Sequence, residues 1–378
     1  MTIKKKQTAK RASKSKYPEH LSPRVKAVRR RMADAGLDAF IVTNAKDIYY
    51  LTGFHGEDAW LLIGTRRVVV LSDFRFQEEL ADFGYFRSVI RSGTMLDAIK
   101  GEVESWPIEK VGVQAEHMTL AQRKALAKSI GAKRLSNQDG WLSEIRIIKS
   151  ADEVANIECA IDIQQRAFKD VRQFIKPGVT EMEVAAYLEY RMRTLGATGF
   201  SFPTIVAAGA KASLPHAVPD KAKVKKNDVL LIDFGAMYGG YCGDLTRTLA
   251  IGRFPKQMAE VYKIVREAEL AAIDAIAPGM ELKAVDAVAR DLITKAGYGE
   301  QFQHSLGHGL GLDVHEQPGL SHRSKDGEVL KPGHVVTVEP GIYLPGVGGV
   351  RIEDDVLVTE NGYRVLSNLP TDIESAII

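Results

Sequence analysis

The spacing of apolar residues divides the chain into two regions, and the first alternates between helix-like and strand-like segments. Apolar positions over 24–32 and over 118–129 follow a helical period. Short apolar runs at 38–43 (DAFIVT) and 67–71 (RVVVL) are typical of buried strands. This alternation predicts an α/β domain that extends from about 21 to 148.

The second region begins with a helix start signal at Ser150. In the segment SADE, Ser150 is placed to cap the helix and Glu153 to reach back to the capping residue. Apolar residues then recur at helical spacing until a Pro-Gly pair at 177–178. Thr180 opens a second segment with the same signal, TEME. Two capped helices are therefore predicted.

The same order of elements returns further along the chain. Helical spacing over 257–276 ends at the Pro-Gly pair 278–279, and the next helix stops near Gly297. Each helix pair precedes a similar strand-like run, KNDVLLIDFG at 226–235 and KPGHVVTVEPG at 331–341. Two copies are too few for a solenoid, so we interpret the region as a duplicated helix–helix–strand–strand unit whose halves face a shared site. Chance similarity is the alternative, and the matching spacing of the glycines argues against it.

Carboxylates stand on two apolar segments of the first half. The run at 229–232 ends in Asp233, a glycine-rich turn follows at 238–241, and Asp244 opens the next apolar run. This spacing predicts a hairpin with an acid on each arm. An ionised carboxylate is costly to bury alone, so each acid must be protonated, paired or bound to a metal ion.

The second half repeats this arrangement with Glu339 and Glu353. The run at 335–338 leads into Glu339, and a further strand predicted over 348–358 carries Glu353. Four carboxylates on apolar strands indicate one shared cation site, because anions gathered in a low dielectric repel one another strongly. Two divalent cations balance the formal charge of four carboxylates, which favours two metal ions over one.

Histidines gather between these strands. His304, His308 and His315 lie in the segment HSLGHGLGLDVHE, where the glycines allow the backbone to approach closely. Oxygen ligands with a single imidazole suit Mn²⁺ or Co²⁺, with Zn²⁺ or Fe²⁺ as alternatives. We therefore expect one of the three histidines to complete the metal site.

Together these motifs resemble the pita-bread metallopeptidases of family M24, the creatinase and methionine aminopeptidase superfamily. The similarity is greatest to the proline-specific branch, Xaa-Pro aminopeptidase and prolidase. In the first region it rests on YLTGF at 50–54 and LSDFR at 71–75. The resemblance implies a creatinase-like α/β domain over 21–148. It also implies an α+β pita-bread catalytic domain over 149–378, with an internal pseudo-two-fold duplication.

The resemblance also implies which residues bind metal. Asp233 would bind one ion, and Asp244 would bridge both. His308 and Glu339 would bind the other ion, and Glu353 would be the second bridge. All five match the family in residue type and order, which argues against its inactive scaffold members and its metal-independent creatinase branch.

Further active-site positions follow from the same resemblance. His216 and His315 would contact the substrate or the tetrahedral intermediate. Glu339 would also carry a proton to the leaving nitrogen. His304 and Arg351 match additional active-site positions of the proline-specific branch.

The expected function is hydrolysis of the Xaa-Pro bond, at the N-terminus of peptides or in dipeptides. We expect a homodimer with two divalent metal ions per chain, Mn²⁺ before Co²⁺, Zn²⁺ or Fe²⁺. Methionine aminopeptidase activity is the nearest alternative, but those enzymes usually lack the first region. A peptide-binding pseudo-enzyme is the other alternative, and the complete ligand set argues against it.

Charge and composition describe the setting of this site. Residues 1–16 carry seven Lys or Arg and no acid, within a net charge of +3, and we interpret 1–20 as a basic, disordered tail. No aromatic residue precedes Tyr17, which argues against nucleic-acid binding. The two cysteines form no CxxC pair, and no apolar run reaches the roughly 18–20 residues of a membrane helix. Because no secretory signal is evident either, we expect a cytoplasmic enzyme.

Overall fold

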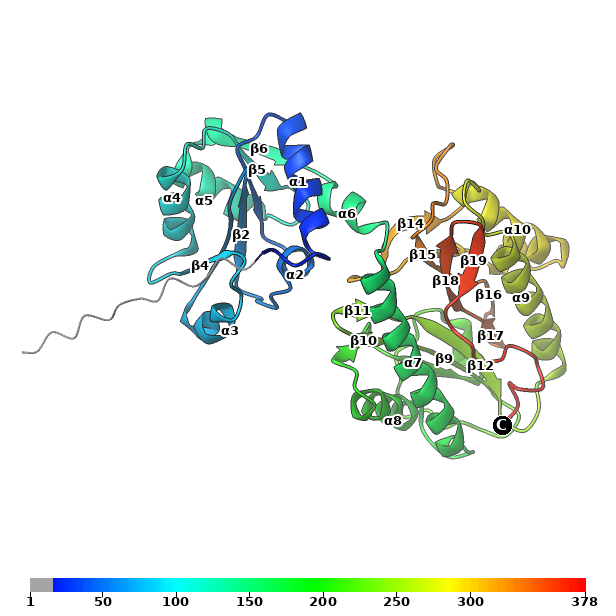
Figure 1. The fold of residues 1–378 in the computed structure, drawn as a ribbon. Coiled ribbons are helices and arrows are strands. Elements are labelled where there is room, and N and C mark those ends of the chain that lie inside the picture. The colour runs from blue at the N-terminus through cyan, green and yellow to red at the C-terminus, as the bar shows by residue number, and fades with distance from the viewer. Residues whose placement is uncertain (1–15) are drawn as a thin grey trace, which may run out of the picture. The chain divides into compact units, whose positions relative to one another are not determined.

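The structure, a computed structural model, describes residues 16–378, so most of the tail predicted over 1–20 lies outside the described residues. The chain forms two compact units, which separate between Ile145 and Arg146 (Figure 1). The division predicted from the sequence, 21–148 and 149–378, stays a prediction. Among the residues that the structure describes, no helix is long and apolar enough to cross a membrane.

The first unit is built on a mixed sheet. Its strands are β1 (Ala39–Val42), β2 (Trp60–Gly64), β3 (Val68–Ser72), β4 (Arg87–Ile90), β5 (Val111–Gln114) and β6 (Leu135–Gln138). They lie in the order β4-β3-β2-β1-β5-β6. The helices are α1 (Ser22–Asp34), α2 (Ala45–Thr52), α3 (Gln77–Ala81), α4 (Met95–Ser105), α5 (Leu120–Ile130) and α6 (Trp141–Arg146), whose last residue belongs to the second unit. Apolar residues of the sheet, α4 and α5 form the core, including Ile41, Val69 and Leu126. The predicted α/β architecture is confirmed.

Long helices frame the second unit. They are α7 (Ala151–Phe174), α8 (Glu181–Thr194), α9 (Lys256–Asp274) and α10 (Leu282–Lys295). Both predicted capping boxes are present, Ser150 with Glu153 and Thr180 with Glu183. After α7 the chain turns through Gly178, whose φ of 98° lies in the left-handed region that favours glycine.

The strands of the second unit form small antiparallel sheets. One sheet has the order β12 (Leu245–Ala250), β9 (Val229–Phe234) and β8 (Ile205–Ala208). Another has the order β14 (Glu316–Leu320), β13 (Gly307–Gly309), β15 (Val335–Val338), β18 (Asp354–Thr359) and β19 (Gly362–Val365). β16 (Gly341–Leu344) pairs with β17 (Gly348–Arg351). The fourth sheet has the order β11 (Tyr241–Cys242), β10 (Ala236–Tyr238) and β7 (Gly199–Phe200).

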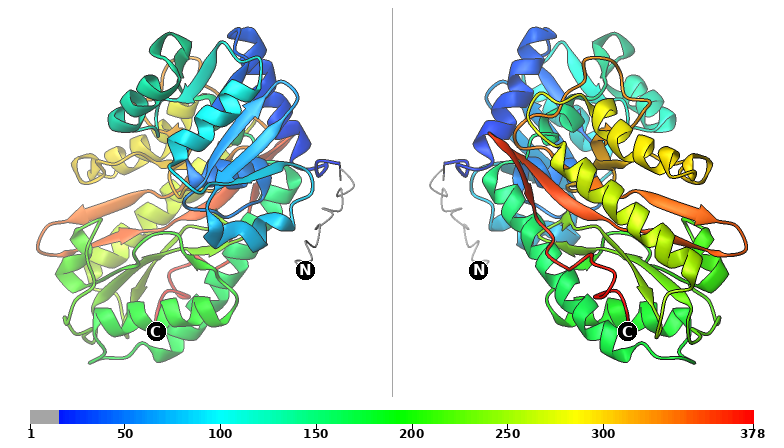
Figure 2. Two further views of the ribbon diagram at one scale, coloured as in Figure 1. Left: turned by 90° about the vertical axis from the view of Figure 1, so that its left-hand side faces the viewer. Right: turned by 90° about the vertical axis from the view of Figure 1, so that its right-hand side faces the viewer.

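The repeated order of elements is present, since α7 and α8 precede β9 and β12 as α9 and α10 precede β15 and β18 (labelled in Figure 1 and seen from two further sides in Figure 2). Strand β9 is buried on both faces. Val229 and Leu231 pack in the apolar cluster of α9 and α10, whereas Leu230 and Ile232 pack in the cluster of α7 and α8. Because alternate side chains of a strand point to opposite faces, Asp233 continues the face of Val229 and Leu231.

The strand predicted over 348–358 is wrong in its extent. It consists of β17 and β18, which lie in different sheets, and Ile352 and Glu353 connect them. The apolar pattern continues through the break because both strands are buried. At the break the backbone N–H of Glu353 donates to the carbonyl of Thr246 at 3.2 Å. This change of sheet brings Glu353 to strand β12 of the first half.

Candidate active site

The five predicted metal ligands come from separate elements of the second unit. Asp233 lies in β9, Asp244 precedes β12, His308 lies in β13, Glu339 follows β15, and Glu353 connects β17 to β18. All five line one cavity of about 1090 Å³. The fold therefore brings together acids that the sequence places in two distant halves.

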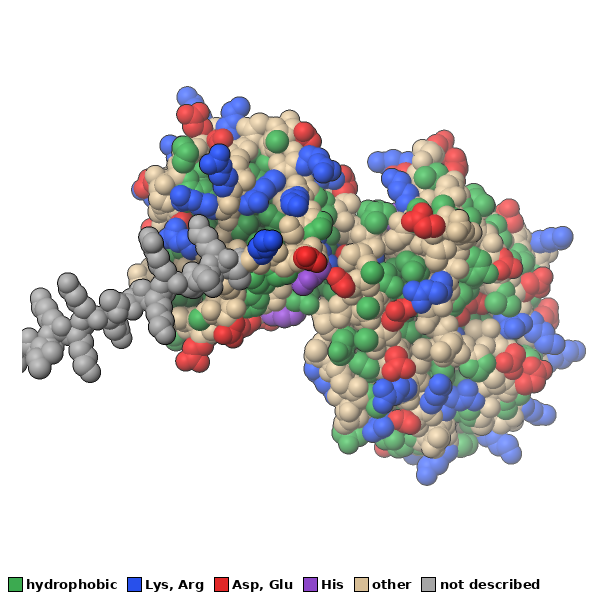
Figure 3. Space-filling view, in the orientation of Figure 1, with side chains coloured by type: hydrophobic (Ala, Val, Ile, Leu, Met, Phe, Trp, Pro, Cys, Tyr) green, Lys and Arg blue, Asp and Glu red, His purple; other side chains and the backbone are tan. Residues whose placement is uncertain are grey.

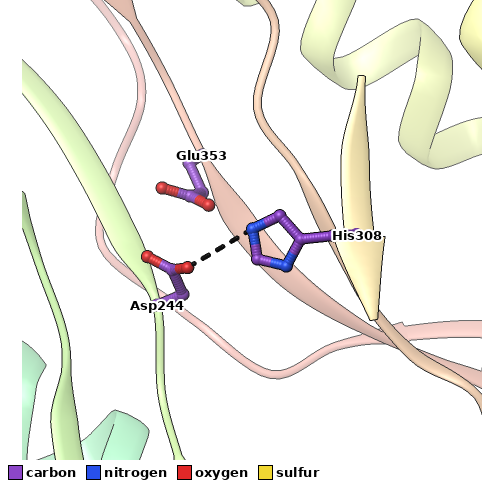
Figure 4. Close-up of side chains that lie close together, drawn as sticks. All are labelled: Asp244, His308 and Glu353. Carbon is purple, nitrogen blue, oxygen red and sulfur yellow. Dashed lines mark ion pairs between the residues drawn. The ribbon is translucent and has the colours of Figure 1, made fainter. Parts of the chain in front are cut away.

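Asp244, His308 and Glu353 form a compact group (Figure 4). Each offers one ligand atom, and these atoms lie within 4.8 Å of one another. Nε2 of His308 is 3.6 Å from Oδ2 of Asp244 and 3.4 Å from Oε1 of Glu339. These separations are small enough for the side chains to share a metal ion.

The carboxylates of the site are strongly perturbed by burial and by one another. Burial raises the pKa of Asp244 well above that of an ordinary aspartate, and nearby Glu353 raises it further. Burial, followed by the charge of Glu339, likewise raises the pKa of Glu353. Burial also raises the pKa of Glu339 to about 8. Carboxyl groups in this setting must bind either protons or a cation.

The donor set fits divalent cations. Burial and the neighbouring His315 lower the pKa of His308 to about 4, so its imidazole is neutral at pH 7, the form that binds metals. Oδ1 of Asp233 is buried and has no hydrogen-bond partner within residues 16–378. Such an oxygen is costly to bury unless a cation binds it. Carboxylates with one imidazole suit Mn²⁺ and similar divalent ions.

A hydrogen-bond network centred on Arg351 lies beside the carboxylates. Its buried guanidinium donates to Oδ2 of Asp233 (2.6 Å), to Oγ1 of Thr246 (3.0 Å) and to the hydroxyl of Tyr343 (2.8 Å). Thr246 donates in turn to Oε2 of Glu353 at 2.7 Å. Arg351 and Thr246 therefore tie carboxylates of both halves into one network.

The network also fixes where His304 carries its proton. Nδ1 of His304 lies 2.8 Å from the carbonyl oxygen of Ser305 and must donate to it, because a carbonyl only accepts. Nε2, at 3.0 Å from the hydroxyl of Tyr343, then accepts the hydroxyl proton. Burial, with a contribution from Arg351, lowers the pKa of His304 to about 4, so the ring is neutral near pH 7.

The remaining predicted residues line the same cavity. His216 lies in the segment between the 3₁₀ helix Gly209–Ser213 and β9, and His315 precedes β14. The ring centroids of His315 and His308 are 4.3 Å apart, with the rings edge to face. The structure thus gathers every site residue predicted from the sequence around one cavity.

Two residues of this site, Tyr343 and Thr246, were missed in the sequence. Both follow an identified acid by an even number of positions, Tyr343 after Glu339 and Thr246 after Asp244. This spacing alone does not identify them, because Glu339 follows β15 whereas Tyr343 lies in β16 of another sheet, and Asp244 precedes β12. Gly341 lies between Glu339 and Tyr343, where a Cβ atom would come within 2.5 Å of the tyrosine hydroxyl.

Comparison with known proteins gives the family. Residues 155–360 match metallopeptidase family M24, and residues 24–148 match the creatinase/prolidase N-terminal domain. The Bacillus subtilis protein named uncharacterized peptidase YqhT is 39% identical over 351 residues, which cover 93% of this chain and 99% of that protein.

Solved structures show the same relationship. The Xaa-Pro dipeptidase from Bacillus anthracis is 38% identical with a TM-score of 0.90, and the match covers 95% of this chain and 100% of that one. The X-Pro aminopeptidase from Thermotoga maritima is 37% identical with a TM-score of 0.87, covering 92% and 100%. The chain therefore belongs to metallopeptidase family M24, with a creatinase/prolidase N-terminal domain ahead of its pita-bread catalytic domain.

Proposed function

We propose that this metallopeptidase hydrolyses the Xaa-Pro bond, at the N-terminus of peptides or in dipeptides. The observation that carries the proposal is one cavity lined by the four predicted carboxylate ligands, by His308 and by the histidines 216, 304 and 315. The similarity to an Xaa-Pro dipeptidase and an X-Pro aminopeptidase supports the choice of bond.

The proposed cofactors are two divalent metal ions, with Mn²⁺ preferred and Co²⁺, Zn²⁺ or Fe²⁺ as alternatives. The residues that would hold them are the five cavity ligands Asp233, Asp244, His308, Glu339 and Glu353. Ions bound there would polarise the scissile carbonyl and lower the pKa of water, which makes a hydroxide nucleophile available near neutral pH.

The side chains around the ligands would handle orientation and protons. His216 and His315 line the cavity and can donate hydrogen bonds to the oxygen on which negative charge develops. Glu339 would carry a proton to the leaving nitrogen of proline. Tyr343, held by Arg351 and His304, forms a fixed polar wall of the cavity.

A substrate panel tests the choice of bond. Purified protein loaded with Mn²⁺ is expected to cleave Ala-Pro or Ala-Pro-Gly-Gly, and the ratio of the two rates distinguishes a dipeptidase from an aminopeptidase. Asp244→Asn, assayed in parallel, is expected to be inactive because it removes a carboxylate of the proposed metal site. Cleavage of Met-Gly-Gly alone would support the methionine aminopeptidase alternative. If no peptide is cleaved, the proposal fails.

The proposed partners are peptides and a second copy of the chain. Figure 3 shows acidic side chains interspersed with Lys and Arg on the visible face of the second unit, a distribution that does not favour a polyanionic partner. Light scattering tests the homodimer, since a dimer has twice the 41.6 kDa mass of the chain. A mass of one chain would contradict it.

A further inference from the structure

The segment 209–220 carries His216 over the cavity, yet much of its outer surface is exposed. Leu214 is 55% exposed and Val218 is 77% exposed, although Ala212 and Ala217 are buried. Small buried side chains contribute little apolar packing to a segment of this length. Arg351 donates to the carbonyl of Pro215 at 3.5 Å, and the other contacts of the segment with distant polar side chains lie near its two ends.

We propose that Glu181 and Lys211 form a clamp that positions this segment, and with it His216, over the cavity. The clamp rests on the role proposed for His216 in peptide hydrolysis. Glu181 and Lys211 are positioning residues, since they act through the segment and do not line the cavity.

Glu181 accepts hydrogen bonds from the backbone at both ends of the segment. Its Oε1 accepts the backbone N–H of Ala208 at 2.8 Å, immediately before the segment. Its Oε2 accepts the backbone N–H of Asp220 at 3.2 Å, at the other end. The side chain is fully buried, and it stands at the first position of α8, where the helix dipole favours a carboxylate.

Lys211 closes the same link from within the segment. Its Nζ lies 2.5 Å from Oε2 of Glu181 and 2.7 Å from Oδ2 of Asp220. A buried carboxylate without a nearby cation would be costly, and Lys211 supplies that cation. The three side chains thus join α8 to both ends of the His216 segment.

The neighbouring Glu183 separates this role from helix capping. Glu183 accepts the backbone N–H of Thr180 at 2.8 Å and completes the capping box, so α8 does not need Glu181 as a cap. Glu183→Gln is therefore a matched control for Glu181→Gln, with the same chemical change two residues away. Lys221→Met, at an exposed position, is the matched control for Lys211→Met.

Hydrogen–deuterium exchange of the purified full chain tests the clamp without requiring activity. Glu181→Gln and Lys211→Met are expected to speed amide exchange across 209–220, whereas Glu183→Gln and Lys221→Met leave it unchanged. Lys211→Arg is expected to restore protection because it keeps the charge. If Glu181→Gln does not fold, the Lys211→Met and Lys211→Arg pair gives the same information. Wild-type exchange in the folded clamp variants would overturn the proposal.

Kinetics on an Xaa-Pro peptide then show whether the clamp acts through His216. Glu181→Gln is expected to lower kcat/KM roughly 10- to 100-fold, the size of effect that misplacement of an active-site group produces. When Glu181→Gln is combined with His216→Ala, kcat/KM should fall no further than in His216→Ala alone. If the two substitutions lowered kcat/KM by independent factors that multiply, the positioning role would be overturned. If the wild type cleaves no Xaa-Pro peptide, the proposed function fails, and the exchange result still decides whether the clamp exists.

Discussion

At the scale of single residues, chemically similar side chains take different roles because their surroundings differ. Glu353 lines the cavity, whereas Asp354 accepts a hydrogen bond from Arg247 at 2.7 Å. Asp355 accepts one from the backbone N–H of Asp244 at 3.2 Å. One acidic run therefore supplies a proposed metal ligand, a partner for a buried arginine and a support for a second proposed ligand.

Tyr343 provides the residue-scale prediction. Tyr343→Phe leaves an Arg351 nitrogen and Nε2 of His304 without their hydroxyl partner in a buried site. We expect a loss of about 1–3 kcal/mol in the free energy of unfolding, measured in urea. Tyr363→Phe is the control, because that hydroxyl bonds Asp274 near the surface. Equal stability of the two variants would contradict the network.

The residues that could be predicted from the sequence are those with a local signature. Asp233 and Glu339 stand out because an apolar strand runs into a charge. Tyr343 and Thr246 do not, because their importance depends on Arg351, which reaches them only through the fold. The different roles of the three acids at 353–355 could not be predicted either, because they depend on contacts with strands from both halves.

At the scale of elements, buried ion pairs fix the turn that leads into β14. Oε2 of Glu316 lies 3.0 Å from Nζ of Lys149, whose side chain is 1% exposed, and Arg146 contacts both Oε1 of Glu316 and the carboxylate of Asp313. Burial alone would raise the pKa of Glu316, but Lys149 and Arg146 outweigh it, so the pKa is lowered. These contacts hold the residues on either side of His315.

The lowered pKa of Glu316 predicts how stability depends on pH. A carboxylate whose pKa is lower in the folded chain than in the unfolded chain stabilises the protein at pH values above its ordinary pKa, here 4.5. This stabilisation is lost as the pH falls through the folded pKa. Glu316→Gln is therefore expected to cost about 3–5 kcal/mol at pH 7, and the difference from the wild type should shrink below pH 4.5.

Urea unfolding at several pH values measures this difference, with Glu360→Gln as the control at an exposed position. A Glu316→Gln penalty that stays constant with pH would contradict the ion-pair account.

The sequence could predict the helices of this unit, because caps and Pro-Gly stops are local. It could not predict the break between β17 and β18, because two buried strands in different sheets share one apolar pattern.

At the scale of the whole molecule, the duplicated unit explains how four acids come to face one cavity. Each half contributes two carboxylates, and only the second half contributes a histidine, His308, to the predicted ligand set. The repeated order of elements could be predicted from the sequence. The distances between the halves could not, because they depend on packing of helices and strands far apart in the chain.

Metal removal is the whole-molecule prediction for stability. Without cations the buried carboxylates must take up protons or repel one another, so the stripped protein is expected to melt at a lower temperature. Mn²⁺ at about 1,000 times its Kd should restore about 4 kcal/mol for each site that binds only the folded chain. Asp244→Asn should lose most of this response in a thermal melt. If Mn²⁺ raised the melting temperature of Asp244→Asn as much as that of the wild type, the stabilisation would come from metal binding outside this site.

The central claim is that two metal ions in this cavity support hydrolysis of the Xaa-Pro bond. The most direct test titrates metal-stripped protein with Mn²⁺ and measures the initial rate of Ala-Pro-Gly-Gly and Ala-Pro cleavage at each addition. We predict that the rate rises to a plateau at two equivalents of bound metal per chain. Full activity with one equivalent, or no cleavage of either peptide at any stoichiometry, would contradict the account.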